Sequence, residues 1–267
     1  MKLTVLTDNN TLIDLYYLGE PAVSYYIEDD DFRCLFDVGY SDVYVKNARA
    51  LGLDLTHLNA VVISHGHNDH TGGLAFFPQA KVKCRLIAHP GAFEPKRAGG
   101  LDISSPLTLK TLKERFAVTL SAKPIELTKH LVFLGEIPRT NNFENQKPIG
   151  EKLLTSTWQA DYVQDDSALV YKSKNGLCII TGCSHAGICN IVEYAKKVTG
   201  DNRVHAVIGG FHLFDAASAQ MQQTIAYFKQ YPKLQLYPCH CTSFAAKAAL
   251  HQVIPIHEVG VSLSLVF

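Results

Sequence analysis

The sequence predicts an α/β protein in which layers of β-sheet are covered by helices. Hydrophobic residues make up 47% of the 267 residues and charged residues 19%, which is typical of a chain that buries a core. Short runs of β-forming residues alternate along the chain with stretches whose apolar residues recur at helical spacing. That alternation is typical of sheets faced by helices. We expect residues 1–267 to form one domain.

The first third of the chain consists mainly of predicted strands. These strands are expected at residues 3–6, 23–27, 33–36 and 60–63. The second and third of them should pair as a hairpin, because the consecutive aspartates at 29–31 form a turn between them. Apolar positions at helical spacing predict a helix over 42–52, and Gly52 suits its C-terminal end.

The middle of the chain gives weaker signals. Residues 107–120 mix helix and strand patterns, and residues 131–134 predict a strand. Residues 138–152 are polar, contain proline and lack periodicity. We therefore predict a long loop there, of the kind that often covers or binds a ligand.

The last third of the chain alternates between strands and helices again. Strands are expected at 167–171, 177–181, 204–208 and 234–237, and helices at 187–198, 215–230 and 244–251. Asn175-Gly176 lies between the first two of these strands and is a strong hairpin signal. Those two strands should therefore be neighbours.

Charge and cysteine content narrow the classes of function. The 25 basic and 25 acidic side chains cancel, so a strongly basic surface for nucleic acid is not expected. No apolar run approaches the roughly 20 residues that span a bilayer, and the N-terminus is polar by Asp8, which leaves no signal-peptide core. The seven cysteines are irregularly spaced, which favours reduced thiols. We expect a cytoplasmic protein without a membrane partner and leave its oligomeric state open.

The strongest chemical signal is a cluster of metal-ligating residues that directly follows the predicted strand at 60–63. It contains His65, His67, Asp69 and His70. Three imidazoles and a carboxylate suit zinc, iron or manganese rather than calcium. Their spacing indicates two ions, because the first two histidines can serve one while the last two residues turn toward a second. A polar turn with solvated histidines is the alternative, but so dense a cluster at a strand end has no packing purpose.

A strand followed by HxHxDH and Gly-Gly resembles the signature of the metallo-β-lactamase superfamily. The resemblance implies a four-layer αββα sandwich, in which two mixed sheets are flanked by helices and hold one or two metals at the sheet edge. Cys183 follows a predicted strand where the family has Asp or Cys, and His240 matches the last family histidine. One further family histidine is missing before the strand at 167–171. Asp165 and Asp166 stand there instead, and His185 is a candidate to replace it.

The resemblance extends to one subgroup of the superfamily along nearly the whole chain. The matching segments are FDVG (36–39), SHGHNDHTGGL (64–74), HPGAF (89–93), GEIPR (135–139), TGCSHAGICN (181–190), GGFHL (209–213) and PCHCT (238–242). They resemble the metal-dependent hydrolases related to dihydropterin-ribofuranosyl-aminobenzene-phosphate synthase. Ser243 departs from the glycine expected there, which affects nothing catalytic.

The remaining candidates each have a plainer alternative. Cys183 is either a thiolate ligand or a small buried residue. Asp165 and Asp166 either supply one ligand between them, in which case Asp166 is favoured because it is nearer the strand, or open a turn. His212 faces the substrate or is a core histidine, and His89 is a weaker case of the same kind. Arg97 and Arg139 either hold an anionic substrate or lie on the surface. The Cys239 and Cys241 pair has no second pair nearby with which to bind a metal.

These residues together predict a metal-dependent hydrolase. The metal ligands would be His65, His67, Asp69, His70, Cys183, His185, His240 and Asp166, with Asp69 and His212 in catalytic roles. Two divalent ions, zinc before iron or manganese, would activate a hydroxide that attacks a carbonyl or phosphoryl centre. The subgroup resemblance implies a phosphate ester or cyclic phosphate of a small anionic metabolite as the substrate. A synthase acting on a phosphorylated pterin and a non-catalytic metal sensor are the alternatives. A di-iron redox protein is disfavoured, because His67 stands where such relatives carry Glu.

Overall fold

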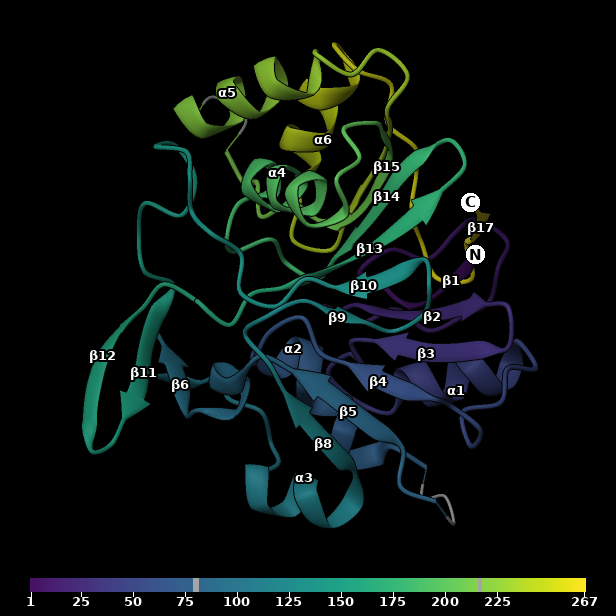
Figure 1. Ribbon diagram of the computed structural model, residues 1–267, viewed down its shortest axis with the longest axis vertical. Helices are drawn as coiled ribbons and strands as arrows, with labels where there is room; N and C mark the ends of the chain where they lie inside the picture. The colour runs from purple at the N-terminus through teal and green to yellow at the C-terminus, as the bar shows by residue number, and fades with distance from the viewer. Residues whose placement is uncertain (79–81, 216–217) are drawn as a thin grey trace.

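Two mixed β-sheets face each other at the centre of the molecule, and helices cover their outer faces (Figure 1). This is the predicted αββα architecture. The computed structural model describes residues 1–78, 82–215 and 218–267. Residues 216 and 217 of the helix predicted at 215–230 lie outside the described residues, and the helix there spans Ala219–Phe228 (α5).

The first sheet combines an antiparallel half with a parallel half. Its order is β17 (Ser264–Val266), β1 (Lys2–Thr7), β2 (Ser24–Asp29), β3 (Phe32–Phe36), β4 (Ala60–Val62), β5 (Arg85–Ala88) and β8 (Ala117–Leu120). Strands β2 and β3 form the predicted hairpin, with Asp29 opposite Phe32. From β3 to β8 all neighbours run parallel. Helices α1 (Val43–Ala50) and α3 (Leu109–Arg115) accompany this sheet.

The second sheet has the same mixed character. Its order is β16 (Gln235–Cys239), β15 (Val204–Gly210), β14 (Gly176–Thr181), β13 (Ala168–Ser173), β10 (Leu131–Phe133) and β9 (Ile125–Glu126). Strands β13 and β14 form the hairpin that Asn175-Gly176 predicts, with Ser173 opposite Gly176. Helices α4 (Ile188–Thr199), α5 and α6 (Phe244–His251) cover its outer face (Figure 1).

Three hydrophobic clusters hold the four layers together, one at each interface. The central cluster lies between the sheets and joins Phe36 to Phe133 and Ile180. The alternate side chains of the same strands point outward, where they pack under α1 and α3 on one side and under α4, α5 and α6 on the other. Period-two alternation thus makes each sheet apolar on both faces, as a buried layer requires.

The structure corrects one prediction in the middle of the chain and resolves another. Residues 150–152 of the predicted loop belong to β11 (Gly150–Leu154), a strand of a third, small sheet beside the sandwich (Figure 1). The order of this sheet is β12 (Thr157–Asp161), β11, β6 (Lys96–Ala98) and β7 (Leu101–Asp102). Most side chains of β11 and β12 are partly or fully exposed. Their sequences therefore lack the alternation of apolar and polar residues by which a strand is predicted. The mixed pattern at 107–120 resolves into α3 followed by β8.

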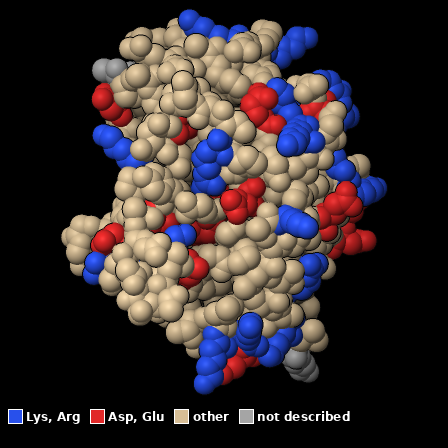
Figure 2. Space-filling view, turned by 60° about the vertical axis from the view of Figure 1, so that its left-hand side comes forward, with Lys and Arg blue, Asp and Glu red and all other residues tan. Residues whose placement is uncertain are grey.

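Within the described residues, no helix combines the length and the apolar character needed to cross a bilayer. On the face shown in Figure 2, Lys and Arg side chains are interspersed with Asp and Glu.

Candidate metal centre

The predicted metal-ligating residues meet at one edge of the sandwich. In each sheet the parallel strands end at this edge, and the loops that follow them carry the candidate side chains. His65, His67, Asp69 and His70 follow β4, and Asp69 and His70 lie in the short helix α2 (Asn68–Thr71). Cys183 and His185 follow β14, His212 follows β15 and His240 follows β16.

These side chains form three overlapping groups, and within each group the ligand atoms lie within 4.8 Å of one another. The first group is His65, His67 and His185, and the second is Asp69, His70, Cys183 and His240. The third group, Cys183, His185 and His212, overlaps both of the others. The structure therefore brings together every predicted site residue except Asp166.

The first group consists of three buried imidazoles. His65 Nε2 lies 3.0 Å from His67 Nδ1, and the His185 ring is 4.7 Å from the His65 ring and 4.8 Å from the His67 ring, centroid to centroid. Burial lowers the pKa of His65 and His185 well below the usual value and that of His67 to about 4. These rings are therefore neutral at physiological pH, and the neutral imidazole is the form that binds a metal.

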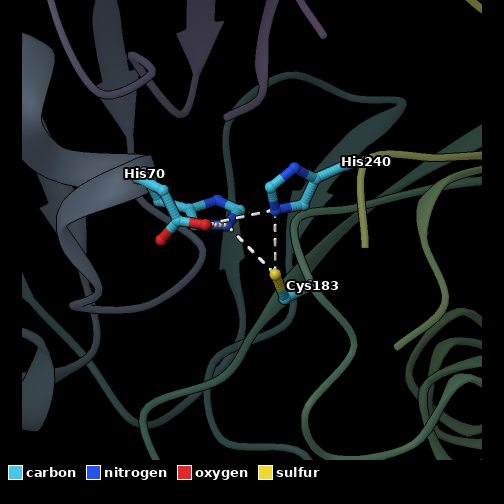
Figure 3. Close-up of side chains that lie close together, drawn as sticks. His70, Cys183 and His240 are labelled. Carbon is cyan, nitrogen blue, oxygen red and sulfur yellow. Dashed lines mark hydrogen bonds and ion pairs between the residues drawn. The ribbon is translucent and has the colours of Figure 1, made fainter. Parts of the chain in front are cut away.

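The second group mixes two imidazoles with a thiol and a carboxylate (Figure 3). Cys183 Sγ lies 3.1 Å from His70 Nε2 and 3.2 Å from His240 Nε2. An Asp69 carboxylate oxygen lies 3.3 Å from His240 Nε2 and 3.5 Å from His70 Nε2. Burial raises the pKa of the Cys183 thiol well above its usual value, so it would ionise only with a cation beside it.

The donor atoms of these groups fit divalent transition metals. Within the described part of the chain, His67 Nε2 and both ring nitrogens of His185 are buried without a hydrogen-bond partner. Buried polar atoms without partners are costly, and a bound cation would satisfy the nitrogens that face it. Imidazole, thiolate and carboxylate together are the ligands of zinc and iron sites, whereas calcium takes oxygen alone.

A buried carboxylate behind the histidines, Asp37, was missed by the sequence analysis, although it lies in a matched segment. Its Oδ2 accepts hydrogen bonds from His70 Nδ1 and from the Ser64 hydroxyl, each at 2.7 Å, and its Oδ1 accepts from the Ser64 backbone N–H. The Ser64 hydroxyl lies 2.9 Å from His65 Nδ1. Asp37 thereby orients the His70 ring so that its Nε2 faces the candidate ligand groups. Through Ser64 it orients the His65 ring in the same way. A carboxylate at the end of the buried strand β3 was the available signal.

Other candidates take structural roles. Arg139 donates to the carbonyls of Ile137 and Val163. Arg97 pairs with Glu151 and stacks on Trp158, so both guanidinium groups are engaged by other parts of the protein.

His89 accepts the N–H of Gly91 at the start of a short 3-10 helix, and Cys239 contacts the Tyr25 hydroxyl between the sheets. Both lie outside the three ligand groups.

The candidate groups open into a cavity of about 570 Å³. Its lining includes His67, Asp69, Cys183, His212 and His240. A second hollow of about 330 Å³ adjoins it, and His185, His212, Ile149 and Phe214 line both. The predicted loop at 138–152 supplies Asn145, Gln146 and Lys147 to this second hollow, so it does contribute to the cavity wall.

Strained backbone marks the same edge of the sandwich. Asp37, Ser184, His212 and His240 adopt left-handed conformations, with φ of 57°, 58°, 51° and 48°. Such a conformation costs a non-glycine residue about 1–2 kcal/mol. Strain of this kind clusters at functional sites, where the surrounding structure holds side chains in place.

The comparisons with known proteins agree with this fold and these residues. The profile of the metallo-beta-lactamase superfamily matches residues 18–145. A curated relative from Methanocaldococcus jannaschii is 35% identical over 226 residues, which are 80% of this chain and 77% of the relative. The chain therefore belongs to the metallo-beta-lactamase superfamily, whose members bind divalent metal ions.

The individual relatives give the resemblance more detail. The 35% identical protein is 7,8-dihydropterin-6-methyl-4-(beta-D-ribofuranosyl)-aminobenzene-5'-phosphate synthase, which confirms the subgroup predicted from the sequence. An uncharacterized protein of the same archaeon is 30% identical over 251 residues, 93% of each chain. The crystal structure of Tm1679, a metal-dependent hydrolase of the beta-lactamase superfamily, is 28% identical and superposes with a TM-score of 0.87, covering 100% of this chain and 99% of that one.

Proposed function

We propose that this protein is a metal-dependent hydrolase that cleaves an ester of a small anionic metabolite, with phosphate esters and cyclic phosphates as the preferred class. The observation that carries the proposal is the pair of adjacent ligand groups, His65 with His67 and His185, and Asp69 with His70, Cys183 and His240, at the wall of one cavity. Divalent ions held there, zinc before iron or manganese, would activate water and stabilise negative charge on oxygen.

The chain's own residues would prepare this chemistry. The neutral imidazoles of the first group are ready to ligate without losing a proton. The Asp69 side chain, 28% exposed, is the accessible member of the second group and would orient the attacking water as well as bind. His212 lines both hollows, and its buried Nδ1 has no partner among the described residues. We propose that His212 contacts the substrate and is not a histidine of the hydrophobic core.

Two observations support an anionic, phosphate-bearing substrate. Lys147 lines the second hollow and can meet a negative group that extends beyond the metal groups. The 35% identical relative is named for a 5'-phosphate product. We further propose a cytoplasmic location, because Cys183 must remain a reduced thiol to ligate a metal.

A second candidate function rests on that relative's activity as a synthase. In this case the same residues would hold the metals, and the enzyme would join a phosphorylated pterin or similar metabolite to a second reactant, with release of a leaving group. The volume of the cavity, about 570 Å³, does not distinguish the two kinds of substrate, so the assay must decide.

The deciding experiment assays metal-loaded protein against phosphomonoesters, phosphodiesters, cyclic phosphates and lactones, and in parallel for bond formation on phosphorylated pterins. We expect hydrolysis of at least one phosphate ester and its loss when the metals are chelated. Turnover in the synthase assay alone would favour the second candidate. Protein that binds metal but turns over nothing in either assay would indicate a non-catalytic sensor.

A further inference from the structure

Two adjacent carboxylates at the sheet edge contact the loops of the first metal group from behind. Asp165 and Asp166 lie just before β13, from which Ser167 separates them, and they are buried, with exposed fractions of 2% and 0%. Asp165 Oδ2 accepts the N–H of Gly66 at 2.8 Å, and Asp166 Oδ2 accepts the N–H of Ala186 at 2.7 Å. Gly66 lies between His65 and His67, and Ala186 follows His185. Each carboxylate thus holds a peptide next to a candidate ligand.

The Asp165 anchor is itself fixed by a buried lysine from the third sheet. Lys96 in β6 is 1% exposed, and its ammonium lies 2.9 Å from Asp165 Oδ1 and 2.7 Å from Asp161 Oδ2. A buried ammonium requires charged partners of this kind, because an unpaired charge in the interior is strongly disfavoured. The opposite side of Gly66 is closed as well, since a Cβ there would lie 1.9 Å from the Ala92 carbonyl oxygen.

One dipeptide therefore spans two loops that come from different sheets. The loop with His65 and His67 follows β4 of the first sheet, and the loop with His185 follows β14 of the second. Asp165 fixes the first loop and Asp166 fixes the second. Because these two residues are neighbours in the chain, the peptide bond between them links the position of the His185 ring to the positions of the His65 and His67 rings. None of the three candidate ligand groups includes Asp166, whose role as a metal ligand stays a prediction from the sequence.

We propose that Asp165 and Asp166 are positioning residues that hold His65, His67 and His185 at ligating distance from one ion, with Lys96 supporting Asp165. This inference rests on the metal binding in the proposed function. In this proposal the two carboxylates do not coordinate the ion. They hold the first ligand group together, and the third sheet contributes to this through Lys96.

The contacts predict an asymmetry between the two aspartates. Both oxygens of Asp165 face donors, so Asp165→Asn turns an amide N–H toward either Lys96 or Gly66. Asp166 has a partner on Oδ2 only, and its Oδ1 has none within the described residues. Asp166→Asn therefore keeps the acceptor for Ala186, whereas Asp166→Ala removes it.

The test titrates zinc into metal-free protein and measures the affinity of each bound equivalent. Asp165→Asn and Asp166→Ala should weaken one equivalent by about 10–100-fold, the usual effect of losing a partner behind the ligands. Asp166→Asn should bind both equivalents as wild type does. With cobalt in place of zinc, the thiolate-to-metal absorption of Cys183 should persist in every variant, because the second group is untouched.

Two results would overturn the inference. Loss of an equivalent in Asp166→Asn would make Asp166 itself a ligand, and wild-type binding in Asp165→Asn would remove its positioning role. If Asp165→Asn does not fold, the comparison of Asp166→Asn with Asp166→Ala decides alone. Asp29→Asn is the control, a buried carboxylate that accepts the Thr128 hydroxyl at the other edge of the first sheet. Failure of the proposed function would give a different result: the wild-type protein would bind zinc but would not turn over any substrate in the assay panel.

Discussion

His65→Ala and Asp69→Asn are each expected to lower activity by more than about 100-fold, because residues that merely support metal ligands already contribute 10–100-fold. His65 belongs to the first ligand group and Asp69 to the second, so each substitution removes a donor from a different candidate group. Both residues lie beyond the end of β4, outside the hydrophobic clusters that join the layers. The fold should therefore remain nearly intact.

Steady-state rates on the substrate identified by the assay panel, together with circular dichroism, check this prediction. His57→Ala and Asp54→Asn are matched controls, because these residues form an exposed pair with Nδ1 and Oδ2 2.6 Å apart, outside the ligand groups. The controls should retain full activity. A folded His65→Ala or Asp69→Asn variant with most of its activity would contradict the metal-dependent mechanism.

Asp37→Asn is expected to weaken metal binding at the second group by about 10–100-fold. Asp37 accepts the N–H of His70 Nδ1, which leaves Nε2 free on the side of Cys183 and His240. An asparagine must direct its NH2 either at His70, which would shift the imidazole proton to Nε2, or at the N–H of Ser64. The first outcome blocks ligation, and the second leaves a buried donor unpaired at a cost of about 1–3 kcal/mol.

Metal titration and thermal unfolding of Asp37→Asn separate these effects. Zinc should be lost first from the group that contains Cys183, which the cobalt thiolate absorption reports directly. Asp29→Asn again serves as control, since it lies in the same sheet but away from the ligands. Unchanged zinc affinity in Asp37→Asn would show that His70 needs no orienting partner.

Local patterns in the sequence predicted the cluster after β4 and the hairpin that leads to His185. The HxHxDH cluster follows a buried strand, and its spacing alone separates His65 and His67 from Asp69 and His70, as the structure also does. The Asn175-Gly176 hairpin placed the start of β13 beside the end of β14. That adjacency indicated His185 as a neighbour of His65 and His67, and the structure places it there.

The part that sequence reasoning missed depends on contacts between distant segments. Asp37 meets His70 across 33 positions, and Lys96 meets Asp165 across 69, so no local spacing relates them. The third sheet is built from short, half-exposed strands that lack an apolar period, which hid both β11 and the burial of Lys96. The contact of Asp166 Oδ2 with the Ala186 N–H, across 20 positions, was likewise not readable from its place before β13.

We propose that the two ligand groups hold two metal ions, and elemental analysis of protein expressed in metal-replete medium tests this most directly. We expect about two transition-metal ions per chain, because the two groups together present more donors than one open site requires. His65→Ala and Asp69→Asn should each reduce that content. Purified wild-type protein that carries no transition metal, and takes up none on zinc titration, would contradict the account.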